Sequence, residues 1–226
     1  MKISRTSTGS DVLDRLLEGG LENDILTTIY GPAGSGKTTT AMICAISIAK
    51  TGKKTVFIDT EGGFSPERLN QLCGADVDIP KRILVMHPLD FQEQMKTLHN
   101  LSRKISSHIG LVVIDTISML YRTELSATKD IKHVNNELGL QISWLTEIAR
   151  RNRIPVLAIN QVYADFDSKD KVKMVGGDIL RYSSKCLIEL LNLNNGRKAV
   201  IKKHRSLPEN KEVTFRIIQE GFIGID

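Results

Sequence analysis

Short apolar runs alternate with longer amphipathic stretches along most of the chain. The runs are rich in β-branched residues and predict buried strands, and the amphipathic stretches between them predict helices. This alternation predicts an α/β fold, with a mostly parallel sheet and helices on both faces. We expect strands at residues 24–31, 53–59, 82–87, 110–115 and 154–162, and helices at 37–51, 65–73, 90–105 and 130–152.

The pattern changes after Ser184, where apolar runs are joined by short turns and no long helical pattern remains. Asn195-Gly196 is a strong hairpin signal between two of these runs. The C-terminal part therefore predicts an antiparallel extension on one edge of the sheet, with strands at 185–193, 197–204, 211–218 and 221–225. No repeat or low-complexity linker interrupts the chain, so we expect residues 1–226 to form a single domain.

The segment GPAGSGKT, residues 31–38, matches the phosphate-binding pattern G-x-x-x-x-G-K-[ST] in full. It follows a predicted strand and opens a predicted helix, so a glycine-rich turn with a chance lysine is a poorer explanation. Lys37 is expected to reach the β- and γ-phosphates of ATP, and Thr38 to offer its hydroxyl to Mg²⁺. The expected nucleotide contacts are Gly31, Pro32, Ala33, Gly34, Ser35, Gly36, Lys37, Thr38 and Thr39.

Three other predicted strands end in polar residues that could complete this site. Asp115 ends the run LVVID, and beside a phosphate-binding loop we expect it to hold the Mg²⁺ shell rather than merely to end a strand. Glu61 follows another strand and could activate water, with Asp59 as the rival carboxylate. Asn160 and Gln161 lie at the end of the apolar strand in AINQV, and these amides could sense the γ-phosphate or be satisfied edge residues.

Together these motifs resemble the RecA/RadA recombinase family. The segments that carry the resemblance occur in the family's order over nearly the whole chain: GSDVLDRLLEGGL, GPAGSGKT, FIDTEGGFSPERL, VVIDTISMLYRTEL, AINQV and VGGDILRYSS. The resemblance implies a RecA-like P-loop core that binds ATP and Mg²⁺. It also implies a role in DNA recombination and repair.

The resemblance assigns roles by position. Glu61 matches the catalytic glutamate, which would act with Lys37, and Gln161 matches the glutamine that couples the γ-phosphate to the second DNA loop. Arg68 matches the arginine that lies over the adenine, although it could also be a solvated helix residue. Arg122 falls in the first DNA loop, and residues 162–175 fall in the second.

The chain also departs from the pattern of full recombinases. No separate N-terminal DNA-binding domain and no aromatic-x-x-Ala linking motif precede Gly9, and SATKDIKH (126–133) stands where a Gly-Arg-rich loop is expected. We therefore expect a monomer or small homo-oligomer that assists the main RadA-type recombinase and hydrolyses ATP weakly. The alternatives are a ring ATPase of the helicase or KaiC type, a small-molecule phosphotransferase, and a non-hydrolysing adaptor that uses ATP only as a ligand.

Net charge permits a nucleic-acid partner, because Lys and Arg total 31 and Asp and Glu total 26, which gives +5. Lys169, Lys171 and Lys173 alternate in the second loop, where interleaved aspartates make a solvated loop as good an explanation as a DNA contact. The cluster IKKHR offers Lys203, His204 and Arg205. Alternation along a strand predicts that Lys203 and Arg205 share one face and Lys202 and His204 the other.

Three interpretations of this cluster stay open. It could bind DNA phosphates. We favour this interpretation and expect the DNA to be single-stranded. Lys203 and Arg205 could instead reach a neighbouring protomer's γ-phosphate, or the cluster could be a solvated hairpin flank.

Cysteine content and the N-terminus bear on the compartment. The cysteines (Cys44, Cys73 and Cys186) lie far apart and have no metal-ligand spacing. The N-terminus has no apolar signal core, and no apolar run reaches the length of a membrane span. We expect a cytoplasmic protein with no membrane partner.

Overall fold

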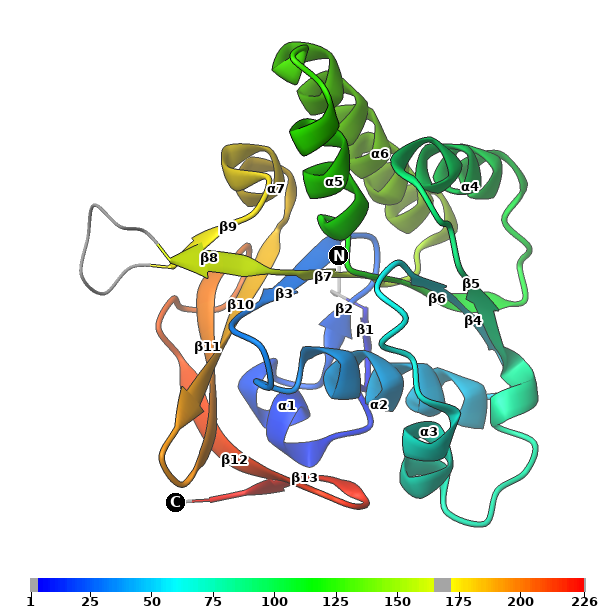
Figure 1. The fold of residues 1–226 in the computed structure, drawn as a ribbon. Helices are drawn as coiled ribbons and strands as arrows, with labels where there is room; N and C mark the ends of the chain where they lie inside the picture. Colours follow the sequence, from blue (N-terminus) through cyan, green and yellow to red (C-terminus); the bar gives the residue numbers. More distant parts are fainter. Residues whose placement is uncertain (1–3, 165–171, 226) are drawn as a thin grey trace.

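The computed structural model describes residues 4–164 and 172–225, and within them nine strands form one twisted sheet (Figure 1). The strand order is β13-β12-β11-β10-β3-β7-β6-β4-β5. From β3 to β5 neighbouring strands run parallel, as the alternating pattern predicts, and β10 also pairs in parallel with β3. These strands are β3 (Leu26–Tyr30), β4 (Lys54–Asp59), β5 (Ile83–Met86), β6 (Ile109–Asp115), β7 (Val156–Asn160), β10 (Cys186–Leu193), β11 (Gly196–His204), β12 (Glu212–Ile218) and β13 (Gly221–Gly224).

The C-terminal strands form the antiparallel extension that the turn-rich pattern predicts. β10 joins the parallel sheet through β3, and β11, β12 and β13 follow it as antiparallel neighbours. In Figure 1 this extension curls beneath the first two helices, with the hairpin between β12 and β13 at the lower edge. The structure therefore confirms an α/β core with a mostly parallel sheet and an antiparallel β extension.

Helices cover both faces of the sheet and form two apolar clusters with it. One face packs against α1 (Asp11–Leu16), α2 (Lys37–Lys50) and α3 (Pro66–Cys73). The other packs against α4 (Phe91–Lys104), α5 (Met119–Ala127), α6 (Ile131–Asn152) and α7 (Gly177–Ser183). The 3-10 turn η1 (Pro80–Arg82) precedes β5.

Side-chain caps set the start of three helices where the polar pattern predicts them. The side chains of Ser65, Asp90 and Asp130 accept hydrogen bonds from backbone N–H groups in the first turns of α3, α4 and α6, respectively. Such a cap satisfies a donor that has no partner within the helix.

Several short elements have no counterpart among the predicted elements. These are the helices α1, α5 and α7, and two small antiparallel sheets, β1 (Arg5–Thr6) with β2 (Leu21–Glu22) and β8 (Val162–Ala164) with β9 (Val172–Met174). α1 has six residues and α7 seven, which is too short for a helical period to show in the sequence. Within residues 4–164 and 172–225, no helix is long and apolar enough to cross a bilayer.

Candidate nucleotide and nucleic-acid sites

The phosphate-binding loop joins β3 to α2, as the motif predicts. Gly36 is the residue before the first turn of α2 and has φ 99°, a left-handed conformation that favours glycine. At Gly31 an added Cβ would lie 2.3 Å from the carbonyl oxygen of Leu190 in β10. Both glycines are therefore required by the path of the backbone.

Lys37 extends back over this loop. Its ammonium group donates hydrogen bonds to the carbonyl oxygens of Gly31 and Pro32, both at 2.8 Å. Burial lowers the pKa of Lys37, while the nearby carboxylates of Asp115 and Glu61 oppose that shift. A partly desolvated cation on a loop at a helix N-terminus is suited to bind phosphate oxygens.

Asp115 ends β6 beside Lys37 and is almost fully buried. Its pKa is raised to about 6, chiefly by burial; the hydrogen bond from Thr38 and the charge of Lys37 oppose this shift, whereas the carboxylates of Glu61 and Asp59 add to it. Its Oδ2 atom is buried without a hydrogen-bond partner among the described residues. One carboxylate and one hydroxyl, with substrate phosphates and water, form a usual ligand set for Mg²⁺, so Asp115 and Thr38 fit this ion.

The structure separates the two rival carboxylates after β4. Asp59 is buried, and its oxygens accept the backbone N–H groups of Gly63 at 3.1 Å and Phe64 at 3.0 Å. Asp59 therefore shapes the loop that follows the strand. Glu61 is exposed and projects from that loop, which makes it the better placed of the two to meet a water molecule.

Glu61 is also the first member of a chain of side-chain hydrogen bonds. Its Oε1 atom accepts the hydroxyl of Thr116 at 2.7 Å and the amide of Gln161 at 2.5 Å. The Gln161 Oε1 atom in turn accepts a guanidinium N–H of Arg122 at 3.0 Å. The structure thus brings together three residues that the sequence assigns to separate segments, and it adds Thr116.

Asn160 makes a separate link to the segment that precedes α7. Its side-chain amide donates to the carbonyl oxygen of Val175 at 2.9 Å, and the N–H of Val175 donates to the carbonyl oxygen of Gln161 at 3.1 Å. The end of β7 is therefore tied to the end of the segment that carries the predicted second DNA loop.

Arg68 lies on α3 and ties it to the C-terminal hairpin. Its guanidinium donates to the carbonyl oxygens of Ile218 at 2.8 Å and Gln219 at 3.0 Å. An added Cβ on Gly36 would lie 2.9 Å from the Ile217 side chain, so this hairpin borders the phosphate-binding loop. The contact with adenine stays a prediction.

Two further side chains hold the loop and were not found from the sequence. Arg197 donates to the carbonyl oxygen of Gly34 at 2.9 Å, and Asn192 donates to that of Ala33 at 3.1 Å. They come from β11 and β10, more than 150 residues along the chain. No local sequence pattern marks such a pair.

The alternation predicted for the basic cluster is wrong. The β10–β11 pairing shifts register between Leu187 and Ile188, which leaves Lys202 without an opposite residue. As a result, Lys202 and Lys203 line the same cleft, whereas His204 and Arg205 both approach Glu22 of β2.

These positions change what the cluster can bind. The His204 side chain is 1% exposed, and its Nδ1 accepts the N–H groups of Ser206 and Leu207 at 3.1 Å. Arg205 forms ion pairs with Glu22 and with Asp24, the latter at 2.8 Å. His204 therefore fits the interior and Arg205 fits a contact with the N-terminal β1–β2 sheet better than either fits DNA, and only Lys203 stays a candidate of the three.

Lys203 lies on a cleft that combines aromatic and cationic side chains. Its ammonium donates to the carbonyl oxygen of Arg181 at 2.7 Å, at the end of α7. Tyr163, 48% exposed, and Tyr182, 72% exposed, line the same cleft with Arg181 and Lys202. We call this the tyrosine–lysine cleft.

Of the three loop lysines, Lys169 and Lys171 lie outside the described residues. The backbone of Lys173 belongs to β9 and pairs with Tyr163 of β8. Their predicted DNA contacts stay predictions.

Comparison with known proteins decides the family. The Rad51 family model matches residues 1–225. The chain belongs to the Rad51 family. The Rad51-family relatives include a DNA repair and recombination protein RadB of Methanobrevibacter smithii, 42% identical over 93% of this chain and 92% of that protein. A protein of the same name from Thermococcus gammatolerans is 40% identical over 95% of this chain and 96% of its own.

A solved structure gives the same result for the fold. It is described as a crystal structure of the RadB recombinase, matches with a TM-score of 0.83 at 37% identity, and covers 97% of this chain and 99% of that one. The family resemblance indicated by the motifs is confirmed.

Proposed function

We propose that this Rad51-family protein binds ATP and Mg²⁺ at the phosphate-binding loop, hydrolyses ATP slowly and binds DNA, and that it assists a main recombinase in recombinational repair. The names of its relatives support a role in DNA repair and recombination. The observation that carries the proposal is the hydrogen-bonded chain from Glu61 through Gln161 to Arg122. It joins a carboxylate beside the phosphate site to a residue that the resemblance assigns to the first DNA loop and that lies on helix α5.

Each residue has a chemical task in this proposal. Lys37 neutralises the β- and γ-phosphates, and Glu61 orients water and accepts its proton. Thr116 and Gln161 both donate to the Oε1 atom of Glu61, which fixes the orientation of the carboxylate. Mg²⁺, held by Thr38 and Asp115, would neutralise charge on the phosphate oxygens.

The tyrosine–lysine cleft supports DNA as the second ligand. Exposed tyrosines can stack on the bases of a single strand, and nearby cations can contact its phosphates. Lys202, Lys203 and Arg181 supply such cations, and Arg122 lies on a second pocket that shares Tyr163 with this cleft. Single-stranded DNA fits best because its bases are free to stack.

Replacement of Lys37 by alanine tests the nucleotide site. We expect a loss of ATP affinity on the order of 100-fold or more, because a charged, partly desolvated phosphate ligand is removed. Equilibrium dialysis with labelled ATP measures this. Lys50→Ala, in the last turn of the same helix, is the control, and wild-type affinity in the Lys37 variant would argue against the site.

Replacement of Arg122 by glutamine tests the coupling to DNA. Without this arginine Gln161 has lost its link to α5, so we expect the ratio of ATP turnover with and without single-stranded DNA to approach one. The slope of log K against log salt for the same DNA should also become less negative by about 0.7, the value for one phosphate contact. Arg103→Gln, on α4, is the control. An unchanged ratio and slope would place the DNA contact elsewhere.

A further inference from the structure

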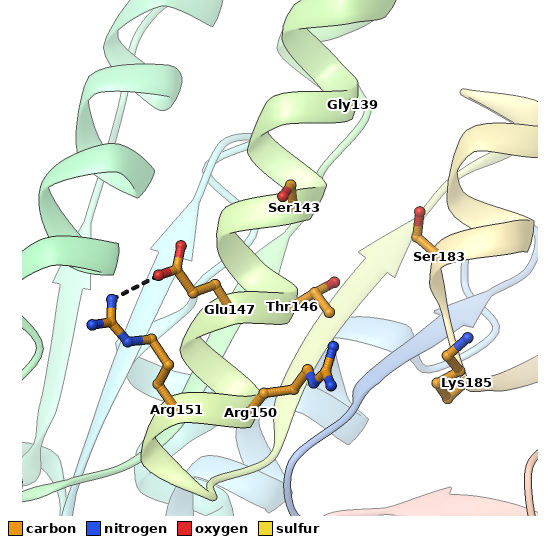
Figure 2. Close-up of a pocket in the computed structure, with 8 residues that line it drawn as sticks. All are labelled: Gly139, Ser143, Thr146, Glu147, Arg150, Arg151, Ser183 and Lys185. Carbon is orange, nitrogen blue, oxygen red and sulfur yellow. Dashed lines mark hydrogen bonds and ion pairs between the residues drawn. The ribbon is translucent and has the colours of Figure 1, made fainter.

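A second basic groove lies beside α6, away from the residues of the nucleotide site. Figure 2 shows it between α6 and the segment that leads from α7 into β10. Along α6 it is lined by small and hydroxyl side chains, followed by a cation in the last turn. These residues are Gly139, Ser143, Thr146 and Arg150, and Ser183 and Lys185 lie across from them.

The charge of this groove is positive and not compensated within it. Its acidic residue, Glu147, is paired with Arg151 at 2.7 Å. Among the described residues, Arg150 and Lys185 form no ion pair and no side-chain hydrogen bond. Arg150 extends from α6 toward the side on which Lys185 lies (Figure 2).

Gly139 keeps the groove open where a side chain would be tolerated. It lies within the 22 residues of α6, and an added Cβ there would meet no atom of the described residues within 4 Å. Glycine in a helix interior costs about 1 kcal/mol relative to alanine. Internal packing does not account for this glycine, which suits close approach by something outside the chain.

The groove and the tyrosine–lysine cleft are both lined by residues at the end of α7 or directly after it. Ser183 and Lys185 line the groove, whereas Arg181 and Lys203 line the cleft. Burial lowers the pKa of Lys203, and the positive charges of Lys185 and Arg181 lower it further. These cations therefore repel one another, and a bound polyanion that passed all of them would relieve that repulsion.

We infer that the groove between α6 and Ser183–Lys185 binds backbone phosphates of a DNA single strand that runs on from the tyrosine–lysine cleft. The inference rests on the proposed DNA binding and adds the path of the strand. A row of cations around α7 matches the repeated charges of a sugar–phosphate backbone. The hydroxyls of Ser143 and Ser183 can donate to phosphate oxygens, and the tyrosines stay confined to the cleft, where bases would stack.

The test compares oligothymidylates of two lengths on the Arg150→Gln/Lys185→Gln protein. An oligomer of about 6 nucleotides can fill the cleft alone, whereas one of about 20 can cover both sites. For the longer oligomer we expect affinity to fall on the order of tenfold at about 0.1 M salt, and the salt slope to become less negative by about 1.4, because two contacts are lost. The short oligomer should bind as it does to the wild type.

The control is Lys50→Gln, which removes a cation from the last turn of α2 on the opposite face of the sheet. It should leave both oligomers unaffected. Thermal unfolding of each variant verifies that all are folded at the temperature of the measurement.

The outcomes separate this inference from the proposed function. If the wild-type protein binds both oligomers and the double variant binds the longer one equally well, the strand does not enter the groove and the inference fails alone. The same holds if the variant keeps DNA affinity but loses binding to poly-glutamate, which would make the groove a site for acidic peptides. If the wild type binds neither oligomer, the proposed DNA binding fails as well.

Discussion

In the Glu61→Gln protein, ATP hydrolysis should fall by about 100- to 10,000-fold while ATP affinity stays within a factor of a few. This range is typical for loss of a general base. The amide can still accept the hydroxyl of Thr116, so the loop should keep its shape and only the proton-accepting group is removed. Single-turnover hydrolysis with enzyme in excess over labelled ATP measures the chemical step directly.

Two control variants sharpen this result. Glu67→Gln changes an exposed carboxylate in the first turn of α3 and should leave turnover unchanged. Asp59→Asn should act differently from Glu61→Gln, because it weakens the hydrogen bonds that fix the loop at Gly63 and Phe64. We expect it to lower stability as well as turnover. Wild-type hydrolysis in the Glu61 variant would show that another group activates the water.

The part of this site that the sequence predicts depends on one property of parallel sheets. The carboxyl ends of β4, β6 and β7 lie along the same edge as that of β3. Polar residues that end apolar runs therefore meet there, even though Asp59, Asp115 and Asn160 are far apart in the chain. The resemblance already favours Glu61 over Asp59, and the structure adds the physical reason, because Asp59 accepts the loop N–H groups of Gly63 and Phe64.

The supports of the site could not be predicted in this way. Arg197 reaches Gly34 and Asn192 reaches Ala33 only because the antiparallel extension pairs β10 with β3. The arrangement of the basic cluster could not be predicted from the sequence either. One register shift, opposite Leu187 and Ile188, changes which sides of the strand the residues 202–205 face. No residue type in the strand predicts this shift.

The pairing of Arg205 with Glu22 predicts that this arginine acts on stability. The Glu22 side chain is fully buried, and it accepts hydrogen bonds from Arg205, Ser206 and Arg5. Breaking a buried ion pair costs about 3–5 kcal/mol, and partial exposure of Arg205 together with the remaining partners should reduce this. We expect Arg205→Ala to lower the free energy of unfolding by about 2–3 kcal/mol, measured by urea denaturation.

The pH dependence of this loss has a definite sign. Burial acts to raise the pKa of Glu22, but hydrogen bonds from Ser206 and Arg205 and the charges of Arg205 and His204 outweigh it and hold the pKa below its ordinary value of 4.5. Such a carboxylate contributes stability above the pKa of the unfolded chain and loses it as pH falls through the lower folded pKa. The difference between wild type and Arg205→Ala should therefore narrow below about pH 4.5.

Two comparisons decide the role of Arg205: the stability effect of breaking an exposed ion pair, and the DNA affinity of the Arg205 variant. Lys211→Ala removes the partner of Glu18 in an exposed ion pair at 2.9 Å and should change stability by less than about 1 kcal/mol. If Arg205 supports the N-terminal β1–β2 sheet, folded Arg205→Ala protein at low temperature binds single-stranded DNA as the wild type does, whereas Lys203→Ala binds it more weakly. If instead Arg205→Ala keeps wild-type stability and loses DNA affinity, the arginine belongs to the DNA surface. The ion pair with Glu22 would then be replaced by a phosphate when DNA binds.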